Sequence, residues 1–242
     1  MRDTPLSNCE RDFLLKAIEE KSALDGRQTY DYGSIKISFG TDYGCCFVDL
    51  GKTRRVFLCP VSSLLRKRTR PNEGIMFFNI ELSPHELLVK LNRQLERCLR
   101  TPSINVCVIR VCLFLQVWQI RVDVHLLNHD GNLMDAASIA AIATLCHFRR
   151  PDVGIPERKS LCTVQEERDP IPLSIYHMPI CVRPTCWLTP CEREERVMDG
   201  LLMIAMNKHR ESAPSSLVGA SLRSLSVKVS EITELINKAF GE

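Results

Sequence analysis

Residues 118–145 read WQIRVDVHLLNHDGNLMDAASIAAIATL, and their pattern predicts more of the architecture than any other part of the chain. The first nine of these residues alternate between apolar and polar side chains, as in a strand with one buried face. Asn128-His129-Asp130-Gly131 is a turn that closes this strand. We expect Asp135 to be the N-cap of the next helix, and Ala136–Leu145, apolar almost all round, to be buried on both sides. A strand, a tight turn and a buried helix in succession predict layers of strands and helices.

Local patterns predict the remaining elements in the same way. Helices are expected up to about Lys21, from the capping box Ser83-Pro84-His85-Glu86, over Val197–Met206 and over Val229–Phe240; strands are expected at Ile35–Phe39, Cys45–Leu50 and Ile175–Val182. No low-complexity linker interrupts them. We therefore expect residues 1–242 to form a single α+β domain, with an N-terminal part of about 1–150 and a C-terminal part of about 151–242.

Composition excludes several classes of protein. At 242 residues and 45% hydrophobic content the chain can bury one substantial core, and its net charge of +3 permits an anionic partner without requiring one. The start of the chain is polar, so no secretory signal is expected, and the run Val106–Val117 is broken by Arg110 and too short to span a membrane. The twelve cysteines are therefore expected to be reduced and mostly buried.

The possible metal ligands do not have the spacing of a metal site. Cys181, Cys186 and Cys191 are evenly spaced but lack the paired C-x-x-C pattern of zinc sites. His125 and His129 lie four residues apart across a strand end, which favours one strand residue and one turn residue. We predict neither a metal site nor a cofactor.

The helix that follows Ser83 has two distinct faces. Its apolar stripe consists of Leu87, Leu88, Leu91, Leu95, Cys98 and Leu99. Its opposite face is cationic and consists of Lys90, Arg93, Arg97 and Arg100. Such a face is either a solvated surface or a contact for RNA phosphates, and these four residues are the candidate RNA-binding residues.

Several blocks of sequence are long enough to indicate a family. They are Leu24–Arg27, Ile37–Cys46, Leu126–Asn132 with Asp135–Ala141, and Glu192–Gly200. In these blocks the chain resembles the RNase PH-like subunits of the eukaryotic RNA exosome. The resemblance implies an RNase PH-like fold, a mixed sheet flanked by helices of the ribosomal protein S5 domain 2-like type.

The resemblance also implies a function and partners. It implies a ring subunit that supports 3'-to-5' RNA processing and decay, including rRNA maturation and mRNA turnover, by scaffolding and RNA threading. The implied partners are other RNase PH-like ring subunits, cap subunits and RNA, with no membrane. The implied locations are nucleus, nucleolus and cytoplasm.

The same resemblance argues against catalysis. Catalytic relatives follow their Asp-Gly turn with a Gly-Thr-Arg-Thr phosphate loop, whereas here Met134 stands in the place of the arginine and the acidic Asp135 lies beside it. A Gly-Arg segment that the family carries before the helix near Glu86 is missing as well. We assign a further acidic group to helix capping: Glu192, Glu194 and Glu195. No catalytic residue is therefore predicted, and an active phosphorolytic exoribonuclease remains the alternative.

Four segments depart from the family: Arg55–Arg70, Thr101–Gln116, Arg183–Pro190 and Ser212–Ser226. The first contains the basic run Arg66–Arg70, which alone resembles a nuclear-import or nucleic-acid patch. Codons for Ser212–Ser221 can instead encode the family's Cys-Thr-Ile-Gln-Ser-Ser-Gly-Gly-Ile in another frame, and Thr185–Pro190 can be a shifted form of its Tyr-Met/Leu-Leu-Val-Asp-Pro. Cys59–Ser63 shifts in the same direction. We hypothesise that the chain is encoded by a gene copy with compensating frameshifts. In the extreme case its product is non-functional. An uninterrupted transcript that encodes these residues would refute the hypothesis.

Overall fold

The computed structural model describes residues 6–20, 23–27, 32–51, 53–66, 75–81, 89, 91–93, 95–97, 116–154, 163–165, 168–173, 175, 178–182, 189–198, 204–206 and 221–241. The helices are α1 (Asn8–Glu19), α3 (Leu133–His147), α4 (Glu192–Val197) and α5 (Ser221–Gly241), with further helical residues at 89, 91–93 and 95–97. The strands are β1 (Ile35–Phe39), β2 (Cys46–Leu50), β3 (Thr53–Arg66), β4 (Ile75–Glu81), β5 (Gln116–Asn128), β6 (Arg149–Arg150), β7 (Asp152–Gly154), β8 (Thr163–Gln165), β9 (Ile171–Pro172), β10 (Ile180–Val182) and β11 (Ile204–Met206).

A five-stranded mixed sheet is the base of the molecule. Its strand order is β1-β2-β3-β5-β4, in which only β4 and β5 are parallel. The register between β3 and β5 shifts between Leu58 and Val61, so β3 carries an extra residue there. Pro60, which has no N–H to donate, falls within this irregularity. The departing segment that begins at Arg55 therefore still forms a strand as far as Arg66.

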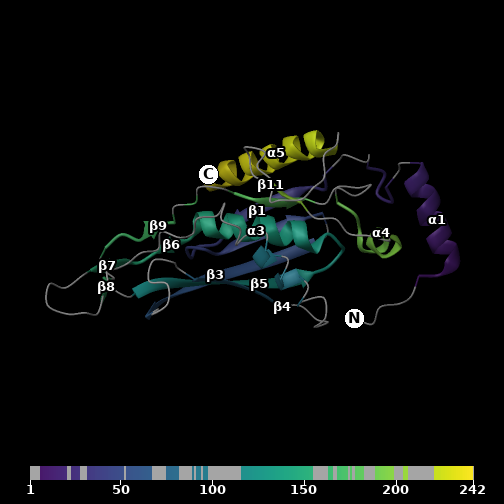
Figure 1. Cartoon of the computed structure of the whole chain (residues 1–242). Helices are drawn as coiled ribbons and strands as arrows, with labels where there is room; N and C mark the ends of the chain where they lie inside the picture. Colours follow the sequence, from purple (N-terminus) through teal and green to yellow (C-terminus); the bar gives the residue numbers. More distant parts are fainter. Residues whose placement is uncertain are drawn as a thin grey trace.

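Helix α3 lies on one face of this sheet and is covered on its other side by α5 and the β10–β11 pair (Figure 1). Alternation places Ile120, Val122 and Val124 of β5 in the core, as the sequence predicted. All residues from Leu133 to Leu145 are buried, and the five alanines among them let the neighbouring layers approach closely. The expected buried helix is thus confirmed, and a single hydrophobic cluster extends from Cys46 to Ile236.

The expected N-cap of α3 is wrong. Asn132 is the N-cap, with a left-handed φ of 48°, and Asp135 lies inside the first turn with 0% exposure. Gly131 has a φ of +87°, so two successive left-handed residues turn the chain into the helix three residues earlier than Asp135. Side-chain preference alone favoured the aspartate, whereas the turn fixed the boundary.

The C-terminal half differs from expectation at two places. The predicted helix over Val197–Met206 is wrong, because α4 already ends at Val197 and Ile204–Met206 is strand β11. Its apolar residues pair with Ile180–Val182, and all residues of both strands are buried. Short apolar runs fit a helix or a strand, and here a partner strand decides. The strand expected from Ile175 is shortened to β10.

Other predictions are confirmed. The N-terminal helix, the β1–β2 hairpin and the C-terminal helix are α1, β1 with β2, and α5. His125 lies in β5 and His129 in the following turn, where its Nδ1 accepts a hydrogen bond from Gly131 N at 3.1 Å. The basic run beyond Arg66 and the departing segments from Thr101 and Ser212 lie largely outside the described residues.

The six cysteines whose side chains the structure describes are free thiols. Two of them are buried, three are partly buried, and Cys9 is exposed. Burial raises the pKa of Cys46 to about 12 and that of Cys146 to about 11, so both remain neutral thiols. No helix within the described part of the chain is long and apolar enough to cross a membrane.

Candidate functional site

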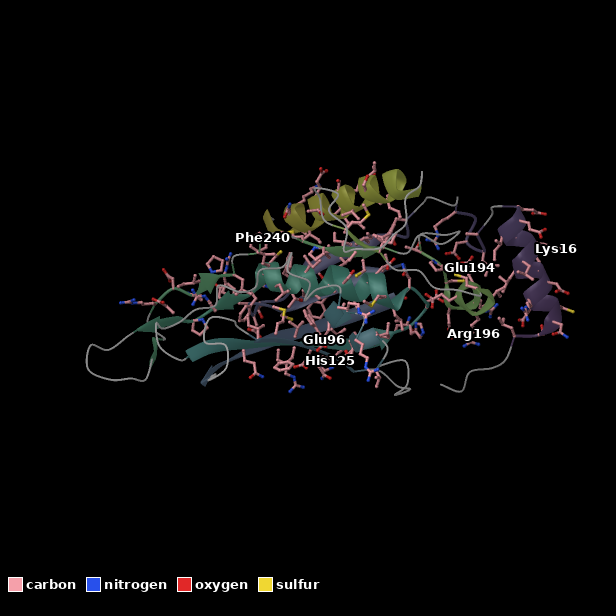
Figure 2. The ribbon with its side chains drawn as sticks, viewed as in Figure 1. Lys16, Glu96, His125, Glu194, Arg196 and Phe240 are labelled. Atoms are coloured by element: carbon pink, nitrogen blue, oxygen red, sulfur yellow. The ribbon has the colours of Figure 1, made fainter. Side chains whose placement is uncertain are left out.

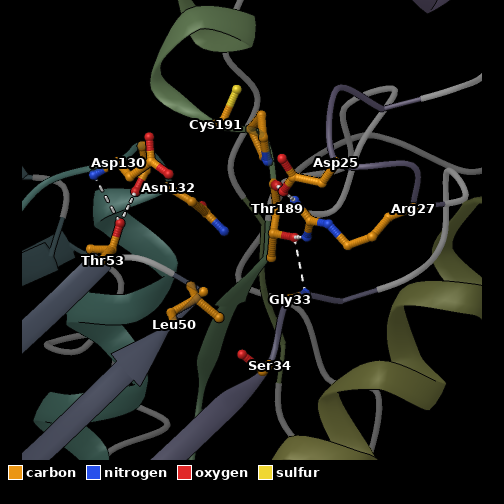
Figure 3. Close-up of a pocket in the computed structure, with 13 residues that line it drawn as sticks. Asp25, Arg27, Gly33, Ser34, Leu50, Thr53, Asp130, Asn132, Thr189 and Cys191 are labelled. Atoms are coloured by element: carbon orange, nitrogen blue, oxygen red, sulfur yellow. Dashed lines mark hydrogen bonds and ion pairs between the residues drawn. The ribbon is translucent and has the colours of Figure 1, made fainter.

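A cavity of about 400 Å³ opens at the N-terminal end of α3 (Figure 3). Four segments that are far apart in the sequence form its wall: Asp25 and Arg27, the open end of the β1–β2 hairpin (Gly33, Ser34, Leu50, Gly51 and Thr53), the turn Asp130–Asn132, and Thr189–Cys191. Each of the four contains or adjoins one of the family-like blocks, so these blocks meet at the cavity.

Arg27 holds two sides of the cavity together. Its guanidinium pairs with Asp25 at 2.8 Å and donates to the hydroxyl of Thr189 and, at 3.2 Å, to the carbonyl of Thr189. Gly33 N also donates to the Thr189 hydroxyl at 3.0 Å. The arginine is therefore occupied by protein groups, and its role is to clamp the segment at Thr189.

The turn before α3 is fixed by one hydroxyl and one glycine. Thr53 Oγ1 donates to Gly131 O at 3.0 Å and accepts from Asp130 N at 3.1 Å. A Cβ at Gly131 would lie 2.7 Å from backbone atoms of Pro190, Cys191 and Glu192. Only glycine allows both the left-handed backbone and this close approach.

Of the three acids of α4 that were predicted to cap it, Glu194 does so, while Glu195 binds the start of α3 and Glu192 forms an ion pair within α4. Glu194 accepts from Cys191 N at 2.8 Å and from Leu24 N at 3.0 Å. Glu195 accepts from Asn132 N at 2.7 Å, and Glu192 pairs with Arg196 at 2.5 Å. Glu195 thus places a carboxylate at the N-terminus of α3, where helix geometry favours an anion.

The first turn of α3 has no cation to offer a phosphate. Met134 and Asp135 are both 0% exposed, and neither side chain lines the cavity. Tyr32 donates its hydroxyl to Asp135 at 3.3 Å. Burial raises the pKa of Cys191 to about 11, so this thiol is neutral and is no nucleophile at neutral pH.

The candidate RNA-binding residues lie elsewhere, on the helix after β4. Among the described residues of this helix, Arg93 and Arg97 are exposed while Leu91 and Leu95 are buried in the core. Asn92 Oδ1 accepts from Ile80 N at 3.0 Å and ties this helix to β4. Lys90 and Arg100 lie outside the described residues, as does Cys186 of the cysteine series.

The sequence interpretation gave no role to Asp25, Arg27 or Thr189. Arg27 belongs to a family-like block, which was the available signal, but its partner is 162 residues away. Thr189 lies in a departing segment, so no motif marked it.

Comparisons with known proteins agree with this geometry. The family model described as "3' exoribonuclease family, domain 1" matches residues 31–151. The chain belongs to the RNase PH family. A curated relative in this family, "Exosome complex component RRP45" of Danio rerio, is 60% identical over 271 aligned residues, which cover 99% of this chain and 68% of that protein.

More distant RNase PH relatives give the same result. The Homo sapiens "Exosome complex component RRP45" is 55% identical, covering 99% of this chain but 61% of that protein, so the chain spans less than two thirds of the human relative. The Schizosaccharomyces pombe protein of that name is 32% identical and is covered to 92%. An alignment of 271 positions is longer than the 242 residues of the chain, so at least 29 positions of the Danio rerio protein have no counterpart here.

Solved structures support the RNase PH fold. A chain of an "Archaeal exosome core" superimposes with a TM-score of 0.72 at 24% identity, covering 96% of both chains. A chain of the "archaeoglobus fulgidus exosome with RNA bound to the active site" gives a TM-score of 0.70 at 23% identity, covering 97% of this chain and 96% of that one. The predicted α+β, RNase PH-like mixed sheet flanked by helices is confirmed.

Proposed function

We propose that this chain is a non-catalytic ring subunit of an RNA exosome, which supports 3'-to-5' RNA processing and decay by scaffolding and RNA threading. The observation that carries the non-catalytic role is the 2.7 Å hydrogen bond from Asn132 N to the Glu195 carboxylate, beside the buried Met134. Phosphorolysis requires positive groups around inorganic phosphate. At this helix end the chain supplies its own anion instead.

The proposed partners are other RNase PH-like ring subunits, cap subunits and RNA. Support comes from the curated relatives, which are named as components of the exosome complex. The sheet supports it as well, because β1 and β4 are edge strands among the described strands, and an open edge is a liability that pairing removes. We also propose a single domain over residues 1–242, acting in rRNA maturation and mRNA turnover in nucleus, nucleolus and cytoplasm.

Co-expression tests the assembly. The tagged chain is expected to co-purify with a catalytic-type RNase PH-like exosome subunit, whereas a stable monomer that ignores this partner contradicts the proposal. The chain is also expected to unfold cooperatively. Failure to fold alone and with the partner would support the non-functional frameshifted copy instead.

Nucleotide release tests the absence of catalysis. The chain is incubated with RNA in phosphate buffer and nucleoside diphosphates are measured; none above the enzyme-free blank is expected. Phosphate-dependent release that disappears in Asp130→Ala, a residue of the cavity wall, would instead favour an active phosphorolytic exoribonuclease.

RNA contact is assigned to the cationic helix face, Lys90, Arg93, Arg97 and Arg100. Arg93 and Arg97 are exposed above two buried leucines, so they can meet phosphates without disturbing the core. Arg93→Glu with Arg97→Glu should weaken RNA binding by the assembled complex and flatten its salt dependence, while Lys16→Glu on α1 is the matched control for charge reversal on an exposed helix. Unchanged affinity and slope would mean that the face is merely solvated.

A further inference from the structure

A second hollow lies between the edge strand β1 and helix α5. Its volume is about 450 Å³, and it is lined by Ile35, Lys36, Ile37, Ser38, Asp49, Leu235, Lys238 and Ala239. Helix α5 contacts β1 directly, so the hollow is a groove between the sheet edge and the helix. Leu235 is 44% exposed although it belongs to the apolar stripe of α5.

Four rings are gathered at one end of this groove, immediately beyond Ser38 of β1 and Ala239 of α5. The His147 ring lies 4.7 Å from Phe39, 6.1 Å from Tyr43 and 6.5 Å from Phe240, measured between centroids. Phe39 and Phe240 meet edge to face at 6.2 Å. Figure 2 shows Phe240 at the end of α5, above the C-terminal end of α3. We call these four residues the ring cluster.

The ring cluster is held in place yet open to solvent. Tyr43 is 52% exposed and Phe240 is 42% exposed, while Phe39 is only partly buried. His147 Nδ1 accepts a hydrogen bond from Gly44 N at 3.1 Å, which fixes the turn that carries Tyr43. Tyr43 lies on a turn fixed by this hydrogen bond and Phe240 on helix α5, so binding would order little additional backbone and cost little conformational entropy.

Cations accompany the rings. The guanidinium of Arg149 lies over the Phe240 ring at 5.6 Å from its centroid. Lys36 on β1 and Lys238 on α5 are exposed on opposite sides of the groove, and Asp49 is the single acid among the groove-lining residues. A groove with cations along it and aromatic rings at its end has the chemistry that binds single-stranded nucleic acid, in which phosphates follow the charge and bases stack on rings.

We propose that the groove between β1 and α5 binds a single strand of RNA, with an unpaired base stacked on Tyr43 or Phe240 and phosphates beside Lys36 and Lys238. This inference rests on the proposed role in RNA processing. It adds a contact in which bases stack on aromatic rings, separate from the purely electrostatic contact assigned to Arg93 and Arg97. The groove-lining residues carry two lysines against one aspartate, Asp49, which lies opposite Lys36 in the β1–β2 register, and the remaining positive charge favours RNA over an apolar protein segment as the occupant.

The test compares a strand with bases and a strand without them. The full chain, in whatever complex it purifies, is titrated with a labelled oligouridylate of about 12 nucleotides and with an abasic phosphodiester strand of the same length. Tyr43→Ala with Phe240→Ala should lower affinity for oligouridylate by roughly ten-fold or more and leave that for the abasic strand unchanged. Lys36→Gln with Lys238→Gln, which leaves the rings intact, should weaken both.

The matched control is Phe77→Ala. Phe77 is 41% exposed on β4, at the opposite edge of the sheet from β1, and its loss should change neither affinity. Absence of oligouridylate binding, an equal loss for both strands, or no loss in either pair of variants overturns the inference. So does a ring-cluster variant that loses its partner subunit while keeping RNA affinity, because the surface is then a protein interface. Co-purification with the partner is measured separately, so the proposed ring role can stand when the groove fails.

Discussion

The two ends of helix α3 differ in what their side chains are used for. At the N-terminal end, Glu195, Thr53 and Arg27 are bound to other parts of the chain, and Gly131 touches the backbone of the segment before α4. At the C-terminal end, Tyr43 and Phe240 gather around His147 with much of their surface exposed. The N-terminal end of α3 is thus bound to other segments of the chain, whereas the C-terminal end presents partly exposed rings beside the guanidinium of Arg149.

The largest expected effect comes from adding a side-chain atom at Gly131, at the N-terminal end of α3. Gly131→Ala places a Cβ 2.7 Å from backbone atoms and forces a φ of +87° on a residue that resists it. Strain and overpacking together should lower the free energy of unfolding by about 3 kcal/mol or more, measured by urea denaturation.

Gly26→Ala is the matched control for this change. Its φ is +74°, but no atom lies within 4 Å of the new Cβ, so only the backbone cost of about 1 kcal/mol is expected. Equal losses in the two variants would mean that the contact between Gly131 and the segment before α4 contributes nothing.

Removing the internal anion should have the next largest effect. Glu195→Ala leaves Asn132 N at the helix end without its carboxylate acceptor, so we expect a loss of about 2 kcal/mol in the free energy of unfolding. Glu192→Gln, which alters the partly exposed pair with Arg196, should change it by less than about 0.5 kcal/mol.

The same variant shows whether the helix end retains affinity for anions. With Glu195 gone, phosphate should raise the melting temperature slightly more than chloride at matched ionic strength, whereas the parent chain should not discriminate. A parent chain that phosphate stabilises strongly would contradict the view that this end is satisfied internally.

The sequence was sufficient for the parts of this comparison that are local. Alternation in β5 and the small residues of α3 predicted the central strand and the buried helix, and Glu194 of α4 was correctly assigned to capping. What failed was set by contacts across the chain. The β11 segment looked helical until β10 gave it a partner, and the clamp joins Arg27 to Thr189 over 162 residues. No local pattern encodes such pairs.

At the C-terminal end, acid should weaken the fold. Burial, aided by the nearby charge of Arg149, lowers the pKa of His147 below its ordinary value of 6.5, and protonation would also replace the Nδ1 acceptor of Gly44 N by a donor. Because the unfolded chain takes up this proton more readily, the stability is present above pH 6.5 and is lost as pH falls through the lower folded value.

Melting curves between pH 7.5 and 5 measure this effect. His147→Phe keeps a ring in the cluster but cannot titrate, so its melting temperature should fall less over this range than that of the parent chain. An identical pH dependence in both proteins would show that His147 titrates alike in the folded and unfolded states.

The smallest expected effect concerns Thr189, and it tests whether threonine is the most stabilising residue at this position. The family resemblance of the sequence implies Val-Asp-Pro where this chain has Leu188-Thr189-Pro190, so on that hypothesis Thr189 replaces an aspartate. Thr189→Asp would keep acceptors for Gly33 N and give Arg27 a charged partner in addition to Asp25. Thr189 is only 7% exposed, so the desolvation of a new carboxylate offsets most of the gain. We expect a net stabilisation below about 1 kcal/mol by urea denaturation, with the uncharged Thr189→Asn showing none. A destabilised aspartate variant would mean that the surrounding residues fit threonine better than aspartate. A recently shifted reading frame should instead leave surroundings that still fit the aspartate.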